Sequence, residues 1–509
     1  MRPVIICLLS FLTLAIQYTA AGQSPRQRVT LFTEKADAYM RRLMAAVPEL
    51  PGVVWVVVKD DKPVWVKAYG WADHERHIKA DENTLFYIAS ATKSFTAMAA
   101  ALLDAQGKIR LDGRIGKYIP AITFKDRVPA DKITVRNLLT HTSGLQNDAL
   151  TFRMAYSGTV DSREMAQVVA NATRYIDSNY LHYHYDNLGY NFYTVLLKEF
   201  MGMEWQQLVQ QQILTPLGMR HSTAYLSQAK KQGRKIAAPY MLYGPDGLKR
   251  SPLEKTDNNL QSAGGLFLTA NDAATWLLVN INKGKLNGRQ VIPAPVMAAC
   301  HQGYTVTQRD IAPFTGKGSY GLGWQIGEYK GDPVHYHFGG FPGYRSHISF
   351  MPEQRIGVAV FVNESGLGGQ IASLLATFAY DWWTGSDKQF DSSYTRQLQD
   401  LVTRHEKNRQ RYDQDYKARA ARKLLLSQPL AAYAGKFVHP DYGTLEISVA
   451  GNALTVRIGL AHCVSTPYPA NETIRVELIP GTGQPIQFRP GANGEILSAV
   501  YDGAEFIKV

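Results

Sequence analysis

The chain has 509 residues, of which 45% are hydrophobic, 11% aromatic and 19% charged. This composition is typical of a globular protein and excludes an intrinsically disordered chain, and the length predicts roughly two to four domains. The formal net charge is +12 at pH 7, but no basic stripe with interleaved aromatic residues accompanies it, so we expect no nucleic-acid partner.

The first 21 residues have the layout of a secretory signal peptide. Arg2 supplies a positive start, residues 4–16 are uncharged and mostly apolar, and small residues at 19–21 precede the expected cleavage site. A membrane anchor is the alternative, but the run is shorter than the about 20 apolar residues of a span. We therefore expect a secreted or periplasmic protein with no stable membrane insertion once residues 1–21 are removed.

Residues 35–385 predict an α+β domain. A strand hairpin is expected over 53–70, and a strongly apolar helix from about Ser90 to Gln106. A second hairpin turns at 352–355, and an apolar helix follows near 367–383. Further helices are expected at 134–145, 188–201, 205–213 and 271–283. The pattern predicts one antiparallel sheet, built from both ends of the domain and flanked by helices, with a helical insert from its middle.

The composition changes twice after residue 385. Residues 386–424 hold ten Lys or Arg and six Asp or Glu with few apolar residues, which indicates a solvated, charged helical linker over 386–428. Residues 429–509 alternate apolar and polar side chains in short runs, so we expect a small, barrel-like antiparallel β domain. Two roles are open for this domain: it could roof the cleft of the first domain, or join protomers into a homo-oligomer.

The string SATK at residues 90–93 is the first candidate for chemistry. Positions three apart share a helix face, so Lys93 would lie beside Ser90 and could take its proton if burial keeps the amine neutral. N–H groups at the helix start could bind an oxyanion. A helix cap with a solvated Lys93 is the alternative. SQAK at 227–230 has the same spacing, but only the first string opens a strongly apolar helix.

Two later strings supply candidate partners. In YDN at 185–187, Tyr185 could relay a proton beside a lysine, and the Asn187 amide could hold that lysine and a substrate carbonyl. An aromatic packing cluster is the alternative for YDN. HFGG at 337–340 precedes a predicted strand, where the glycines would let a substrate backbone approach and N–H groups could complete an oxyanion hole. A glycine-rich turn is the alternative for HFGG, and HQG at 301–303 is a similar string without a following strand.

Together these strings, in this order, resemble the serine β-lactamase and penicillin-binding-protein family, in its class C and esterase-like branch. The resemblance covers about residues 35–385 and includes FYIASATKSFTA, VRNLLTHTSGL, SAGGLFLTANDAATWL and YGLGW. It implies a β-lactamase/transpeptidase-like fold in which Ser90 is the nucleophile, Lys93 its activator and Tyr185 the general acid/base. The substrate-binding residues that it implies are Asn187, His337, Gly339 and Gly340, with the N–H groups of Ser90 and Gly340 as the oxyanion hole. The C-terminal β domain resembles the one appended to some peptidase-like members.

The sequence departs from the family pattern at one position, and this departure narrows the function that the resemblance implies. β-Lactamases and transpeptidases of this branch usually carry a lysine, which meets a substrate carboxylate, where this chain has His337. We therefore expect a serine hydrolase of small peptide, ester or amide substrates, D-amino-acid peptides included. A β-lactamase or cell-wall D,D-carboxypeptidase is the first alternative, and a catalytically silent penicillin-binding-like sensor or binding protein is the second.

No cofactor and no metal are expected, because no group of Cys, His and carboxylate residues has metal-ligand spacing. Cys7 lies in the predicted signal peptide. Cys300 and Cys463 fall in different predicted domains, and both a disulfide and two free thiols remain open for them.

Overall fold

The computed structural model describes residues 24–158, 162–242, 247–307 and 312–509. The predicted signal peptide at 1–21 and Cys7 lie outside the described residues. Within these ranges, no helix combines the length and the apolar character that a membrane span requires. Cys300 is a buried free thiol and Cys463 a half-buried one.

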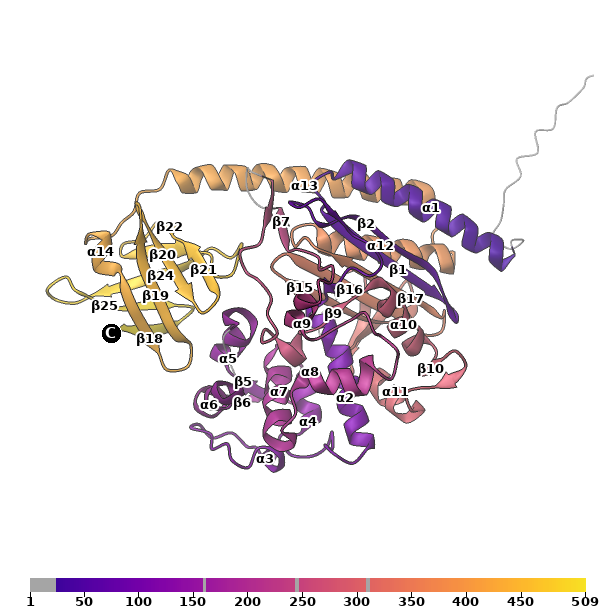
Figure 1. Ribbon diagram of the computed structural model, residues 1–509, viewed down its shortest axis with the longest axis horizontal. Helices are drawn as coiled ribbons and strands as arrows, with labels where there is room; N and C mark the ends of the chain where they lie inside the picture. Colours follow the sequence, from indigo (N-terminus) through magenta and orange to yellow (C-terminus); the bar gives the residue numbers. More distant parts are fainter. Residues whose placement is uncertain (1–23, 159–161, 243–246, 308–311) are drawn as a thin grey trace, which may run out of the picture.

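A nine-stranded antiparallel sheet organises the larger part of the molecule, in the order β12-β13-β14-β15-β16-β17-β1-β2-β3 (Figure 1). Its strands are β1 (Gly52–Lys59), β2 (Lys62–Asp73), β3 (Ile78–Lys79), β12 (Thr305–Val306), β13 (Thr315–Tyr320), β14 (Gln325–Tyr329), β15 (Asp332–Phe341), β16 (Tyr344–Met351) and β17 (Ile356–Val362). Both predicted hairpins are therefore present. They meet where β1 pairs with β17, with Val53 opposite Val362, so the two ends of the domain do build one sheet.

The sheet separates two hydrophobic cores because alternate side chains of β1 point to opposite faces. Val53, Trp55 and Val57 pack with α1 (Pro25–Ala46) and α12 (Gly368–Thr384). Val54, Val56 and Val58 belong to the core of the other face, which includes α2 (Thr92–Ala105) and α10 (Ala270–Ile281). A strand that is buried on both faces has a continuous apolar sequence, which explains the run VVWVVV.

The middle of the chain forms the helical insert. Its helices are α3 (Ile115–Tyr118), α4 (Val135–Leu139), α5 (Asp148–Phe152), α6 (Ser162–Ala172), α7 (Leu188–Met201), α8 (Trp205–Val209), α9 (Leu226–Lys231) and α11 (Ala294–His301), with π-helical turns η3 (Arg153–Ser157) and η4 (Gln210–Leu214). Short strand pairs join β4 (Phe86–Tyr87) to β9 (Phe267–Leu268), β5 (Ser143–Gln146) to β6 (Arg174–Tyr180), β7 (Tyr240–Leu242) to β8 (Leu248–Arg250) and β10 (Lys285–Leu286) to β11 (Arg289–Gln290).

The helix predicted over 134–145 is shorter than expected. It ends at Leu139, because His141 and Gly144 adopt left-handed backbone angles, with φ of 59° and 70°, that no right-handed helix tolerates. The chain then enters β5 instead.

The segment predicted as a linker contains a 31-residue helix, α13 (Phe390–Ala420). Tyr394, Leu398 and Leu401 are buried, so the first half of α13 packs on the domain rather than standing free in solvent. Lys35 of α1 bonds Asp391 of α13 at 2.6 Å, and the two helices lie side by side (Figure 1).

The C-terminal residues form a second nine-stranded antiparallel sheet, in the order β21-β20-β19-β18-β26-β25-β24-β23-β22, which curls into a barrel-like shape (Figure 1). Its elements are α14 (Leu430–Tyr433), β18 (Gly435–His439), β19 (Gly443–Ala450), β20 (Ala453–Ile458), β21 (Ala461–Val464), β22 (Thr466–Pro467), β23 (Thr473–Val476), β24 (Gln484–Pro490), β25 (Ile496–Tyr501) and β26 (Ala504–Lys508). The predicted fold class, an α+β domain followed by a barrel-like β domain, is confirmed.

The β domain touches the helical insert. The Phe152 ring lies 5.7 Å from that of Tyr442 and 5.9 Å from that of Tyr501, measured between centroids. The backbone N–H of Leu460 donates to the Ser157 carbonyl at 2.9 Å. These contacts fix the β domain against α5 and η3.

Candidate active site

Ser90 lies in a one-turn 3₁₀ helix, η2 (Ala89–Ala91), that leads directly into α2. Ala89 has a φ of 46°, which is unfavourable for a residue with a side chain. Strained backbone of this kind persists only where the surrounding structure holds it in place. Ser90 itself is half-buried, so its hydroxyl is open to the cavity while the helix behind it belongs to the core.

Lys93 is fully buried, and three oxygens surround its amine. Its Nζ lies 3.2 Å from Ser90 Oγ, 2.8 Å from Asn187 Oδ1 and 2.8 Å from the Ala263 carbonyl oxygen. Burial lowers the pKa of Lys93 to about 7, although the nearby Asp186 carboxylate raises it in part. The amine is therefore neutral in a large fraction of molecules near pH 7, which is the state that can accept a proton from Ser90.

Tyr185 and Asn187 approach Lys93 from the loop before α7. The Lys93 Nζ lies 5.2 Å from the centre of the Tyr185 ring, and that ring keeps 37% of its surface exposed. Burial of its inner side raises the pKa of Tyr185 to about 12, and a hydrogen bond with Ser90 opposes the rise. Tyr185 is thus protonated at neutral pH and can donate a proton.

The HFGG string at 337–340, the third of the three candidate motifs, reaches the site because β15 passes close to η2. A Cβ atom on residue 339 would lie 2.0 Å from the Ile88 carbonyl oxygen, so only glycine fits there. Ser346 of the next strand donates its hydroxyl to the same carbonyl at 2.6 Å. Since β14 pairs with β15 only as far as Tyr336, the edge at 337–341 has no partner strand on that side among the described residues. Gly340 is exposed on this edge.

His337 is buried and neutral. Its Nδ1 lies 2.8 Å from the Phe338 carbonyl, to which it can donate, and its Nε2 lies 3.3 Å from the Tyr320 hydroxyl. Burial lowers the pKa of His337 to about 3, and the positive charge of Lys93 lowers it further. The third motif therefore carries no positive charge at neutral pH.

Two groups of the site were not assigned a role from the sequence. The Ala263 carbonyl belongs to SAGG, and His141 to LLTHTSGL, both of which were noted only as flanking strings. His141 is buried, accepts the Asp186 N–H at 3.4 Å through Nδ1, and lies with its ring 4.6 Å from that of Tyr185. It holds the loop that carries Tyr185.

The structure brings Ser90, Lys93, Tyr185 and Asn187 together, with His337 6.1 Å from Tyr185 between ring centres. The similar strings, SQAK at 227–230 and HQG at 301–303, lie outside this group and make other contacts. Ser227 bonds Asp257, and Lys230 pairs with Glu254 at 3.4 Å. His301 bonds Asn280 at 2.9 Å. Among the described residues, no cluster of His, Cys, Asp and Glu could hold a metal ion.

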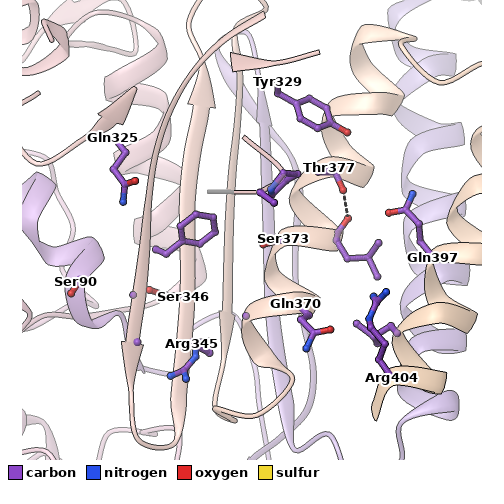
Figure 2. Close-up of a pocket in the computed structure, with 18 of the residues that line it drawn as sticks. Ser90, Gln325, Tyr329, Arg345, Ser346, Gln370, Ser373, Thr377, Gln397 and Arg404 are labelled. Atoms are coloured by element: carbon purple, nitrogen blue, oxygen red, sulfur yellow. Dashed lines mark hydrogen bonds between the residues drawn. The ribbon is translucent and has the colours of Figure 1, made fainter. Parts of the chain in front are cut away.

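A cavity of about 1100 Å³ is lined by Ser90, Tyr185, Gly339 and Gly340, among others. Figure 2 shows it from Ser90 to Arg404. Its described lining ends at Arg404 of α13 and includes no residue of the β domain.

Comparisons with known proteins bear on the family and the fold of the chain. A family model described as "Beta-lactamase" matches residues 40–376. The chain is 24% identical over 430 residues to "Unguisins hydrolase ungD" of Aspergillus violaceofuscus, covering 78% of this chain and 74% of that protein.

Two solved structures share the fold. The octameric penicillin-binding protein homologue from Pyrococcus abyssi aligns with a TM-score of 0.61 at 21% identity, over 94% of this chain and 100% of that one. The D-amino acid amidase from Ochrobactrum anthropi SV3, complexed with L-phenylalanine, aligns with a TM-score of 0.55 at 19% identity, over 69% of this chain and 98% of that one.

Proposed function

The chain belongs to the beta-lactamase family and is a serine hydrolase; from this we propose that it is exported and cleaves peptide or ester bonds through an acyl-enzyme on Ser90. The observation that carries the proposal is the position of Lys93. A fully buried amine with a pKa lowered to about 7 lies 3.2 Å from the Ser90 hydroxyl. A serine is a weak nucleophile without such a base.

Acylation starts with neutral Lys93. As Ser90 Oγ attacks the substrate carbonyl carbon, its proton moves to Lys93 Nζ, and the carbonyl oxygen becomes an oxyanion. The N–H groups of Ser90 and Gly340 are proposed to stabilise that oxyanion. Tyr185 then gives its proton to the leaving nitrogen or oxygen and regains one from Lys93, so the bond to the leaving group breaks and Lys93 is neutral again.

Deacylation repeats the same steps with water. Water attacks the acyl carbon and passes a proton to the Lys93–Tyr185 pair, and that proton returns to Ser90 Oγ as the ester bond breaks. Asn187 is proposed to hold both Lys93 and the substrate carbonyl group, since its Oδ1 accepts from Lys93 and leaves its NH₂ group as a donor.

The substrate class follows from the third motif and from the relatives. A neutral His337 offers no cation to the carboxylate of a penicillin, which disfavours β-lactams as substrates. One relative is named a hydrolase of unguisins and a structural neighbour is a D-amino acid amidase. The second name supports small amides as substrates, D-amino-acid compounds included, and the first supports a hydrolytic reaction.

The test compares two serine variants on one substrate panel. We expect Ser90→Ala to lower kcat/KM at least a thousandfold on p-nitrophenyl esters and on D- or L-amino-acid amides. Ser227→Ala is the matched control, because Ser227 has the same SxxK spacing but bonds Asp257, and its kinetics should equal those of the wild type.

A fluorophosphonate probe should label the wild type and Ser227→Ala but not Ser90→Ala. Full turnover by Ser90→Ala would overturn the proposal. Rapid hydrolysis of a chromogenic cephalosporin would instead favour a β-lactamase. No labelling and no turnover by the wild type would favour a silent binding protein.

A further inference from the structure

The cavity at Ser90 continues past the free edge of β15. Beyond Phe338 and Gly340 it is bounded by α12 and then by α13 (Figure 2). Figure 2 shows Gln370, Ser373 and Thr377 on α12 on one side of this space, and Gln397 and Arg404 on α13 on the other. The groove therefore extends to a helix that follows the matched family region, which ends at residue 376.

Four residues of α13 line the groove: Gln397, Asp400, Leu401 and Arg404. Their spacing of three and four places them on one stripe of the helix. The stripe is held in position, because Leu401 is buried and Tyr394 donates its hydroxyl to Asp381 of α12 at 2.8 Å. A helix stripe that points toward protein is ordinarily apolar, yet three of these four residues are polar or charged.

Two guanidinium groups face the groove, and neither pairs with a carboxylate of a described residue. Arg345 donates to the Phe341 and Tyr344 carbonyl oxygens at 3.3 and 3.0 Å, and within the described ranges it forms no ion pair. Arg404 likewise forms no ion pair with any described residue, and Asp400, one turn earlier, is not within ion-pair distance of it. Since His337 is neutral, these arginines are the cations that a substrate in the described groove would meet.

The middle of the groove is apolar, with Phe338, Leu374 and Leu401 in its lining. Arg345 lies beside Gly340, on the side of the groove near Ser90, whereas Arg404 lies on the far side, on α13 (Figure 2). A volume of about 1100 Å³ is at the upper end for a small-molecule site and exceeds what one amino-acid derivative fills.

We propose that the groove binds an extended substrate with an anionic group, and that Arg404 selects for this group. The inference rests on the proposed function, because it names the substrate class of the same site. A planar guanidinium binds a carboxylate or phosphate through paired hydrogen bonds. Asp400 on the same stripe repels an anion, so removing its charge and removing that of Arg404 should have opposite effects.

The experiment uses two series of esters and the full-length protein. In one, p-nitrophenyl half-esters of dicarboxylic acids of increasing length place a carboxylate on the acyl side. In the other, butyrate esters of hydroxyphenyl-alkanoic acids place it on the leaving side. Each compound has a neutral methyl-ester counterpart, and kcat/KM is measured for every pair at low and at physiological salt.

We expect the wild type to prefer the anionic member above a certain chain length in at least one series. Arg404→Gln should lower kcat/KM on that member about threefold to tenfold and leave the neutral member unchanged. Asp400→Asn should raise it, and high salt should weaken the preference. Arg411→Gln is the matched control, because Arg411 lies two turns further along α13, is exposed and does not line the groove.

Equal kcat/KM for charged and neutral members in both series would overturn the inference, as would an equal loss in Arg404→Gln and Arg411→Gln. Neither result affects the proposed function, which the neutral esters and Ser90→Ala test separately. Thermal unfolding of each variant is the control that the substitution leaves the fold intact.

Discussion

In the proposed mechanism, Lys93 determines the pH at which Ser90 can be activated. Burial lowers the pKa of Lys93 to about 7, and only the neutral amine can take the serine proton. We therefore expect kcat/KM for a neutral ester to rise with pH up to an inflection near pH 7 and then to level off. A neutral ester is required because its own charge does not change over this range.

The neighbouring Asp186 allows a second test of whether the inflection near pH 7 belongs to Lys93. Its carboxylate raises the pKa of Lys93, so removing the negative charge should make the amine easier to deprotonate. In Asp186→Asn the inflection should move to lower pH, while the side-chain oxygen that accepts the Gly189 N–H at 3.3 Å is retained. An unchanged inflection, or one moved to higher pH, would assign the titration to a group other than Lys93.

At the scale of elements, the close approach of β15 to η2 depends on Gly339. An alanine there would place its Cβ 2.0 Å from the Ile88 carbonyl oxygen, which is backbone and cannot move aside freely. Gly339→Ala should push the strand away from Ser90 and lower kcat at least a hundredfold, since small misplacements at a site cost large factors in rate.

Gly327 on the neighbouring strand β14 is a suitable control for this change. A Cβ there would come no closer than 3.3 Å, to the Thr315 carbonyl oxygen. Gly327→Ala should retain most of the activity. Similar kcat values for the two variants, with both proteins folded by circular dichroism, would contradict the steric explanation.

Elements with a strong local pattern could be predicted from the sequence. β1 was readable because burial on both faces requires a continuous apolar run, and α2 because its apolar side chains recur along a helix that Gly107 stops. The helix at 134–145 was predicted too long because a left-handed His141 is not visible in a sequence. α13 was expected to be solvated because its many charges conceal the stripe Tyr394, Leu398 and Leu401.

The same limit explains which parts of the site were predictable. The contacts at the site involve the side chains of four residues, so the residue types at these positions allow a prediction from the sequence. These residues are Ser90, Lys93, Tyr185 and Asn187. The third acceptor of Lys93 is a backbone carbonyl, that of Ala263, and any residue type supplies one. Its position depends on a turn in which Leu260 and Gln261 both adopt positive φ, which no local sequence preference of these residues suggests.

For the molecule as a whole, Phe152 is the residue through which the two domains share a core. It is 4% exposed, and its ring contacts Tyr156 of the insert as well as Tyr442 and Tyr501 of the β domain. Phe152→Ala should lower the free energy of unfolding by about 3 to 5 kcal/mol, measured by urea denaturation. Phe200→Ala removes a ring that is 43% exposed and should cost clearly less.

If the interface also supports the active site, Phe152→Ala should lower kcat as well. The π-helical turn η3 follows Phe152 directly, and its Met154 carbonyl accepts the Leu260 N–H at 2.7 Å. Leu260 begins the turn that presents the Ala263 carbonyl to Lys93. Wild-type kcat in a destabilised Phe152→Ala protein would show that the interface contributes to stability alone.

The pairing of β1 with β17 also has a consequence for biosynthesis. Ser90, the proposed nucleophile, is made early, but β15, which faces it, and β17, which completes the sheet, are made about 240 to 270 residues later, and only then can Val362 pair with Val53. A ribosome-bound chain that stops before β17 holds Ser90 and Lys93 but lacks the strand that joins the two halves of the sheet. We therefore expect hydrolytic activity to appear only once synthesis has passed residue 362, so that truncated products are inert rather than unregulated hydrolases.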